Sequence, residues 1–341
     1  MKKSFETFAK PRGGDALVAG NIGLASHFTR SPKRQDVAST WMFAAGSVLA
    51  GVAILTLAGC AAQKFTVDTA VGAAGQGDAK AQYFLAIHYA KGDGMPRDPA
   101  KAADYMRQAA VGGYAFAQND LGGYYLTGMG VKADPQTANQ WFQKAAAQGD
   151  PLAEYSLGVS YAQGRGVAQD ISEALKWYQK SAAQNQREAL AALGDLYYFG
   201  DQGVPRDYSA AFKFYKIAAT RGSTACLNSL GLMYEHGFGV KPDLNQAIHC
   251  YREAAAKKNG YAMMNLGCLY MDGRGVVRDP VEAYKWFTLA VRNRAGPARH
   301  YLQVLGGQLP MSESKMTPAQ RAEAVRRADA FSTATEKSPT K

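Results

Sequence analysis

Hydrophobic and small residues recur along most of the chain with a period of 36 or 37 residues. The first half of each unit places a small residue, a Leu and a Tyr at four-residue intervals, which puts all three on one face of a helix. The repeated pairs are Leu85 and Tyr89, Leu121 and Tyr125, Leu157 and Tyr161, Leu193 and Tyr197, Leu230 and Tyr234, and Leu266 and Tyr270. A fixed period of this length predicts a stack of similar units.

The pattern of each unit predicts two helices, helix A and helix B, joined by a glycine-containing turn. Glycine permits positive φ where helix A ends, and the Asp that follows favours the start of helix B as an N-cap. These Asp residues are Asp98, Asp134, Asp170, Asp207, Asp243 and Asp279. We expect the aromatic pair of helix B, Trp177-Tyr178 for example, to fill the groove between hairpins. Gly158, next to Leu157, should let a neighbouring helix approach closely.

The order Ala, Leu-Gly, Tyr, Gly-x-Gly-Val, Asp, Ala, Trp-Tyr and Ala-Ala resembles the Sel-one-like repeat, a relative of the tetratricopeptide repeat. The resemblance covers Asp78 to Gly296. It implies an all-α fold, a right-handed superhelical α/α solenoid of about six helix-turn-helix repeats with helical caps. The first copy departs from the pattern at Ala86 and Met95, and Asp201-Gln202-Gly203 lengthens the fourth turn by one residue.

We divide the chain into five segments. They are 1–59, a basic flank plus a lipoprotein signal or membrane anchor; 60–65, a short linker; 66–296, the solenoid; 297–331, carboxyl-terminal capping helices; and 332–341, a disordered tail. A half-repeat before Asp78 should cover the first hairpin, because the end faces of a solenoid need caps.

The carboxyl-terminal cap has a clear helix start. Thr317-Pro318-Ala319-Gln320 combines a Thr N-cap, Pro at the first helical position and Gln in position for a capping box. In the helix that follows we expect Ala322, Val325 and Phe331 to form the apolar side. Three arginines, Arg321, Arg326 and Arg327, should face solvent.

The segment from Trp41 to Ala62 contains 22 residues without a charge. It ends on Leu57-Ala58-Gly59-Cys60, which resembles a bacterial lipobox and implies that Cys60 is the lipidated first residue of the mature protein. The alternative is an uncleaved transmembrane helix, since about 20 apolar residues span a bilayer. Both interpretations place the repeats outside the cytoplasm, because Lys and Arg are in excess on the amino-terminal side of the apolar segment.

Composition and motifs offer little support for an enzyme. The chain is 47% hydrophobic with a net charge of +11, and it lacks a phosphate loop, H-E-x-x-H and C-x-x-C. Ser312-Glu313-Ser314-Lys315 fits the S-x-x-K pattern, but its companion motifs are missing. We therefore expect no catalytic residues, no metal ligands and no cofactor.

The cysteines add a constraint. With Cys60 acylated, an odd number remains in an oxidising compartment: Cys226, Cys250 and Cys268. Cys226 and Cys250 replace packing residues of the repeat, and helical register argues against a disulfide between them. Disulfide-bonded relatives pair a Cys at the position of Cys226 with one near Ala254, a partner this chain lacks.

A candidate partner-binding stripe lies opposite the packed Leu of each helix A, at positions two and five residues before and after it. Its varied residues are Tyr83, Phe116, Asn119, Tyr155, Asp195, Tyr198, Asn228, Tyr261 and Met264. The tetratricopeptide resemblance implies that this stripe lines the concave groove. In the alternative, these side chains pack against adjacent helices and a partner uses the convex face or the caps.

These observations favour a non-enzymatic protein-protein interaction scaffold of the bacterial cell envelope. We expect an outer-membrane lipoprotein that faces the periplasm and binds a protein or peptide partner. In the alternative, an amino-terminal helix anchors the protein in the inner membrane with the repeats in the periplasm. Neither nucleic acid nor a small-molecule substrate is expected. One alternative is a membrane-anchored regulator whose residues 1–40 signal in the cytoplasm. Another is a hydrolase acting on β-lactams or cell wall.

Overall fold

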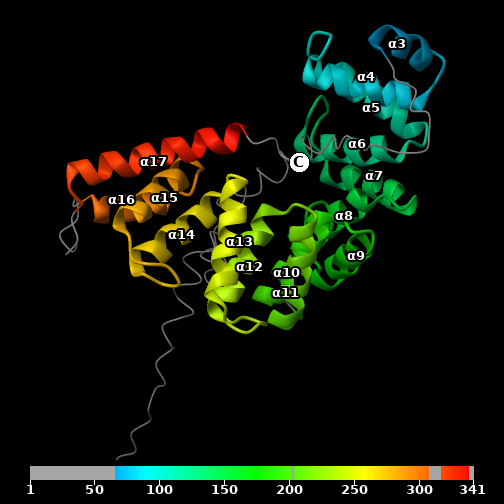
Figure 1. Ribbon diagram of the computed structural model, residues 1–341. Coiled ribbons are helices and arrows are strands. Elements are labelled where there is room, and N and C mark those ends of the chain that lie inside the picture. Colours follow the sequence, from blue (N-terminus) through cyan, green and yellow to red (C-terminus); the bar gives the residue numbers. More distant parts are fainter. Residues whose placement is uncertain (1–65, 201–202, 307–315, 338–341) are drawn as a thin grey trace, which may run out of the picture. The chain divides into compact units, whose positions relative to one another are not determined.

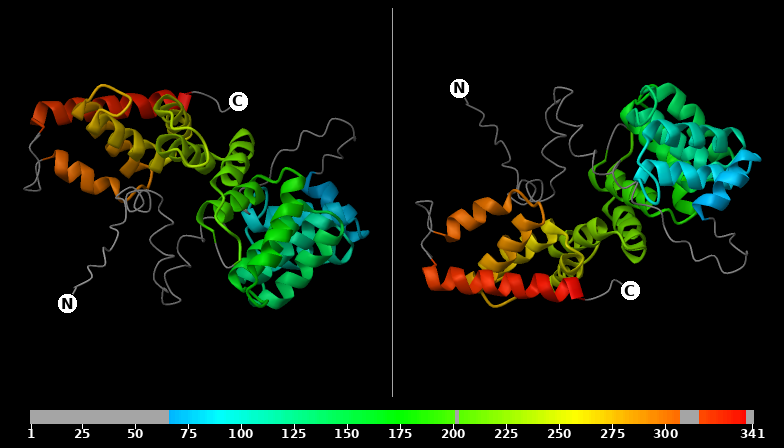
Figure 2. Two further views of the ribbon diagram at one scale, coloured as in Figure 1. Left: turned by 90° about the horizontal axis from the view of Figure 1, so that it is seen from below. Right: turned by 90° about the horizontal axis from the view of Figure 1, so that it is seen from above.

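The computed structural model describes residues 66–200, 203–306 and 316–337. Helices are labelled as in Figure 1, and Figure 2 shows them from two further directions. The chain divides between Ser223 and Thr224 into two compact units, which are described separately. We call residues 66–223 the N-unit and residues 224–337 the C-unit. Cys60, its apolar segment and Ser312-Lys315 lie outside the described residues.

The predicted helix pairs are present, and every helix of a pair has 13 residues. In the N-unit, α3 (Val67–Gly75) precedes α4 (Ala79–Lys91), α5 (Pro99–Val111), α6 (Ala115–Thr127), α7 (Pro135–Ala147), α8 (Pro151–Gln163), α9 (Ile171–Ala183), α10 (Arg187–Phe199) and α11 (Tyr208–Thr220). In the C-unit, α12 (Thr224–His236), α13 (Leu244–Ala256), α14 (Gly260–Asp272) and α15 (Pro280–Arg292) are followed by α16 (Ala298–Leu305) and α17 (Pro318–Lys337). Even-numbered helices from α4 to α14 are helices A. The all-helical fold of paired helices is confirmed.

The turn from helix A to helix B is built from hydrogen bonds that the sequence pattern predicts. Gly92 ends α4 with φ 77°, and Asp98 accepts from the amides of Ala100 and Lys101 at 3.1 and 3.0 Å. The Asp98 amide itself donates to the Tyr89 carbonyl at 2.9 Å. All six predicted Asp residues cap a helix B by accepting a hydrogen bond from an amide of its first turn.

The second glycine of the turn also joins one repeat to the next. Gly130 has φ 69°, and a β-carbon there would collide with the carbonyl group of Pro99, where the preceding helix B begins. Gly166 is placed against Pro135 in the same manner. In the C-unit, a β-carbon on Gly275 would lie 3.0 Å from the Leu244 side chain. Glycine is therefore required here both for its backbone conformation and for the close contact between repeats.

The core of each hairpin forms where the Leu-Gly pair of helix A meets an aromatic ring of helix B. Leu121 is fully buried, and a β-carbon on Gly122 would lie 2.5 Å from Cε1 of Phe142. Four further glycines meet a ring in the same way: Gly158 with Tyr178, Gly194 with Tyr215, Gly231 with Tyr251, and Gly267 with Phe287. The predicted close approach at these glycines is thus present, with helix B of the same repeat.

The two residues of the helix B aromatic pair pack in different places. Tyr178 is 4% exposed and meets Gly158 of its own hairpin. Trp177 is half-buried and packs against the cluster that contains Phe142 and Leu157, as expected for the groove between hairpins. Adjacent helical residues point about 100° apart, so only one of the two can face the Leu-Gly pair. In the first repeat, Ala86 replaces the glycine and Met106 replaces the ring, and both lie in one buried cluster.

The carboxyl-terminal cap begins as predicted, and its apolar side is partly as expected. Thr317 and Gln320 form the expected capping box, with hydrogen bonds of 2.8 and 3.2 Å. The buried residues of α17 are Ala324 and Ala328, while Ala322 is exposed. The predicted apolar side was therefore wrong at Ala322, whereas Phe331 does pack, with its ring centroid 5.1 Å from that of Trp286 on α15.

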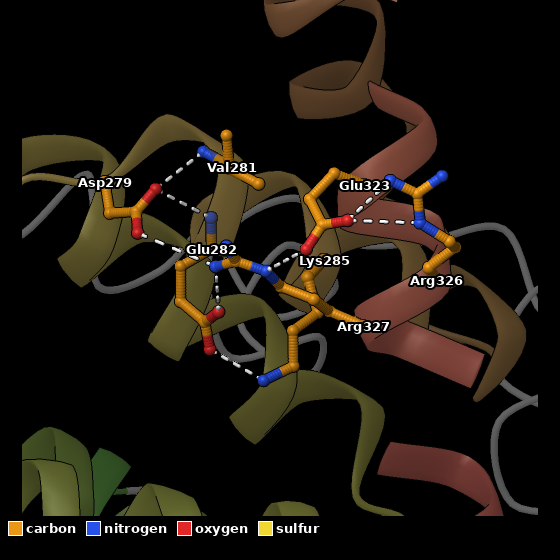
Figure 3. Close-up of polar contacts among 7 residues, drawn as sticks. All are labelled: Asp279, Val281, Glu282, Lys285, Glu323, Arg326 and Arg327. Atoms are coloured by element: carbon orange, nitrogen blue, oxygen red, sulfur yellow. Dashed lines mark hydrogen bonds and ion pairs between the residues drawn. The ribbon is translucent and has the colours of Figure 1, made fainter. Parts of the chain in front are cut away.

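Charged residues connect α17 to α15 (Figure 3). Arg327 Nη1 lies 3.6 Å from Glu282 on α15 and 4.0 Å from Asp279 at the N-cap of α15, and its Nε lies 3.0 Å from Glu323 on α17. Arg321, expected in solvent, is half-buried and donates to the carbonyls of Gly306 and Met316. The helix also continues to Lys337, so residues 332–337 do not belong to a disordered tail.

Candidate binding surface

The nine predicted partner-binding residues differ in how much surface they expose. Phe116 is 46% exposed, and Tyr83, Tyr155, Asp195 and Tyr261 are half-buried. Asn119, Tyr198, Asn228 and Met264 are buried, with exposed fractions of 4, 6, 8 and 0%. Met264 therefore has no surface to offer a partner in this conformation. Binding by the exposed members stays a prediction.

Part of the stripe is buried because it connects successive A helices. Tyr83 of α4 donates its hydroxyl to Asp120 Oδ2 of α6 at 2.8 Å. Ser156 Oγ of α8 lies 3.4 Å from Asn119 Oδ1 of α6. In the C-unit, the Asn265 side chain donates to Asn228 Oδ1 at 3.0 Å. These residues hold the A helices together, as the packing alternative predicted for the stripe.

Exposed apolar side chains remain at one edge of the stripe in the N-unit. Phe116 of α6 and Leu152 of α8 occupy equivalent positions of neighbouring repeats and are 46% and 37% exposed. The ring centroid of Tyr114 lies 5.5 Å from that of Phe116 and 5.2 Å from that of Tyr83, with interplanar angles of 69° and 68°. Three rings therefore form a chain of edge-to-face contacts from α4 to α6.

Tyr114 was missed by our sequence reasoning, although its position carried a signal. It stands at the N-cap of α6 and makes no side-chain capping bond, whereas Asp78 and Asp150 cap α4 and α8. An aromatic residue where neighbouring repeats have a capping Asp suggests a role other than capping. We use the term A-helix surface for Tyr83, Tyr114, Phe116, Asp120, Leu152 and Tyr155.

Two carboxyl groups on the A helices of the N-unit lie in surroundings that disfavour their ionised form. Burial raises the pKa of Asp120 to about 6, although hydrogen bonds from Tyr83 and Asn119 lower it and the charge of Asp150 raises it further. Burial likewise raises the pKa of Asp195 to about 6, with only the Tyr215 hydroxyl opposing it. No basic group contributes to either pKa. The ionised forms therefore lack a compensating positive charge.

Glu154 of α8, in the same unit, differs from Asp120 and Asp195 because it has a basic partner. Glu154 has no exposed surface, but Lys180 Nζ lies 3.0 Å from its Oε1. The Gln184 side chain donates to Glu154 Oε2 at 2.8 Å. The more deeply buried acid is thus paired with a cation, whereas Asp120 and Asp195 receive only neutral donors. An unpaired carboxylate of this kind is a candidate binding group.

The raised pKa values predict a pH dependence of stability. An acid whose pKa is higher in the folded than in the unfolded protein stabilises the fold at pH values below its unfolded pKa, which is near 3.8. This stabilisation is lost as the pH rises through the folded-state pKa of about 6. Asp120→Asn and Asp195→Asn should therefore stabilise the protein at pH 7.5 by on the order of 1–3 kcal/mol, and much less at pH 4. Urea unfolding of wild type and variants at both pH values measures this difference. Equal stability changes at both pH values would show that the pKa values are normal.

The described part of the chain shows few features that would support a metal site, a disulfide or a membrane span. It contains no group of three or more His, Cys, Asp or Glu side chains that could hold a metal ion. Cys226 and Cys250 are both buried and are not joined by a disulfide, in agreement with the predicted register. None of the helices in the described ranges is long and apolar enough to cross a bilayer.

Paired 13-residue helices, capping aspartates and glycine-to-ring contacts define the class of α/α repeat proteins. Six consecutive stretches match the model of the Sel1 repeat, namely residues 79–114, 115–150, 151–186, 187–223, 224–259 and 260–293. The chain therefore belongs to the Sel1 repeat family, as the sequence resemblance indicated.

Two solved structures of this family are similar to the chain. One is c5321, described as a protective antigen of uropathogenic Escherichia coli with an SLR fold, at 30% identity and a TM-score of 0.64. The alignment covers 78% of this chain but only 58% of that protein. The other is a Sel1 repeat protein from Oxalobacter formigenes at 32% identity and a TM-score of 0.61, with 67% of this chain and 99% of that one covered. No curated protein matches the chain.

Proposed function

We propose that this protein is a non-enzymatic interaction scaffold that binds a protein partner on its A-helix surface. The observation that carries the proposal is the exposure of Phe116 and Leu152 at equivalent positions of adjacent repeats, beside the rings of Tyr83 and Tyr114. Exposed aromatic and apolar side chains are the usual anchors of protein interfaces. Repeat arrays suit this role because their stacked helices present an extended surface.

A photo-crosslinking experiment tests the location of the binding surface. A benzophenone amino acid replaces Phe116 or Leu152 on the A helices, and Val111 or Ile217 on helices B, in the protein produced by its own bacterial host. All four side chains are exposed, Val111 by 72% and Ile217 by 41%. We expect discrete crosslinked partners from positions 116 and 152 alone. Crosslinks mainly from positions 111 and 217 would assign binding to the helix B side.

We further propose that the scaffold acts in the bacterial cell envelope, attached to the outer membrane through a lipid on Cys60. The support is the apolar segment that ends on Leu57-Ala58-Gly59-Cys60. Ala61, rather than Asp, at the following position resembles the outer-membrane class of lipoproteins. Retention of the segment as an anchor would instead leave residues 1–40 in the cytoplasm and favour the regulator.

A further inference from the structure

The A-helix surface contains one position where a carboxylate, aromatic rings and an unpartnered hydroxyl come together. Asp120 accepts from the Tyr83 hydroxyl at 2.8 Å and from the Asn119 side chain at 3.2 Å. Tyr124, on the next turn of α6, is only 3% exposed, and its hydroxyl has no hydrogen-bond partner. The charge of Asp120 is close enough to raise the pKa of Tyr114 and Tyr124, after burial itself.

These groups match the requirements of a positively charged side chain. An ammonium or guanidinium group needs a carboxylate to pair with and oxygen atoms to accept its remaining hydrogens. It also gains energy beside the faces of aromatic rings. The rings of Tyr83 and Tyr114 stand at 68° to each other, so that two ring faces can border one cation. The A-helix surface thus offers each element that a cation requires.

The free-energy cost of keeping the Asp120 carboxylate without a basic partner also suggests that this residue has a function. A half-buried carboxylate without a basic partner destabilises the folded protein at neutral pH, and such costs are typically retained at functional sites. Replacement of Asp120 by a neutral residue would remove the cost. Glu154, one repeat further on, avoids it by pairing with Lys180. The missing cation at Asp120 can instead come from a partner.

We propose that the A-helix surface binds a Lys or Arg side chain of its protein partner at Asp120, bordered by the rings of Tyr83 and Tyr114. This inference rests on the proposed function and specifies the chemistry of the partner at that surface. The cation pairs with the carboxylate, and Tyr124 supplies an additional acceptor. Phe116 and Leu152 then contact the apolar residues that flank the cationic side chain.

Binding at this position should depend on pH. Apart from Asp120, the ionisable groups that face it are Tyr83 from α4, Tyr114 and Tyr124 from α6, and Asp150 at the start of α8. The tyrosines stay neutral over the range from pH 5 to 8, because their pKa values are raised. Protonation of Asp120 should therefore weaken binding of a cation as pH falls from 7.5 to 5.5.

The test uses fluorescein-labelled tetralysine amide, with labelled tetraglutamine as the uncharged probe, and measures fluorescence anisotropy against the full-length protein at low salt. We expect Asp120→Asn to raise the Kd for tetralysine at least fivefold. Tyr114→Ala should raise it at least threefold without changing the net charge. Asp104→Asn, an exposed acid of α5 paired with Arg107, makes the same charge change elsewhere and should leave the Kd unchanged.

Several outcomes would overturn the proposal. Equal loss of affinity in Asp120→Asn and Asp104→Asn would mean that only the overall charge attracts tetralysine. An unchanged Kd in both Asp120→Asn and Tyr114→Ala, with circular dichroism showing normal folding, would place the cation elsewhere. Absence of tetralysine binding together with crosslinks from positions 116 and 152 would reject the cation site while leaving the proposed function intact.

Discussion

Gly122→Ala should destabilise the N-unit even though alanine is the better helix former. A β-carbon at Gly122 would lie 2.5 and 2.7 Å from two ring atoms of Phe142, so the helices must separate or the ring must move. Such overpacking costs about 1–3 kcal/mol, which outweighs the helix-propensity gain of about 1 kcal/mol. The measurement is urea unfolding of the full-length chain followed by circular dichroism.

The neighbouring residue provides a matched control. A β-carbon on Gly123 would have nothing within 4 Å, so Gly123→Ala should be neutral or stabilise by up to about 1 kcal/mol. The first repeat suggests a rescue, because Ala86 and Met106 there occupy the positions of the glycine and the ring. Phe142→Met should recover most of the stability lost in Gly122→Ala, since Met is flexible. Equal effects of alanine at positions 122 and 123 would contradict the packing described.

Cys60→Ser should abolish incorporation of radiolabelled fatty acid into the protein. The expectation follows from the proposed lipidation of Cys60, because serine lacks the thiol that would carry the acyl chain. Each buried methylene contributes about 0.8 kcal/mol to membrane attachment, so loss of the lipid should also release the protein from the outer-membrane fraction. Fractionation and autoradiography measure both effects.

A second substitution separates lipidation from general damage to the segment. Cys268→Ser changes a cysteine of α14 and should leave labelling at the wild-type level. If Cys60→Ser is labelled normally, the lipobox interpretation is wrong and the apolar segment serves as an uncleaved anchor. If the wild-type protein is recovered mainly with the inner membrane, the outer-membrane placement is wrong.

The repeat architecture was predictable because its determinants are local. A capping Asp contacts amides two and three residues ahead, as Asp98 does with Ala100 and Lys101. The turn glycines adopt a conformation that few other residues tolerate. Six copies of such signals leave little freedom in the positions of the helices, and the boundaries of the repeats therefore followed from spacing alone.

The binding surface was less predictable because exposure depends on the neighbouring helix. Phe116 and Met264 both belong to the predicted stripe, yet one is 46% exposed and the other 0%. Helical rotation gives the direction of a side chain relative to its own helix and not what lies beyond it. The same limit explains Ala322 of α17, which we expected on the apolar side of the helix and which is exposed.

Within each unit, the turn glycines that lie against the preceding helix B give the repeats a polarity. Gly130 lies against Pro99, and Gly166 against Pro135, so these two turns are completed by residues that were synthesised earlier. When such a hairpin leaves the ribosome, the helix B that its turn contacts has therefore already been synthesised. The turn of the earlier hairpin makes its own contact without the later hairpin. Where this contact is present, assembly can proceed in step with translation, because the earlier repeat supplies the surface on which the next turn forms.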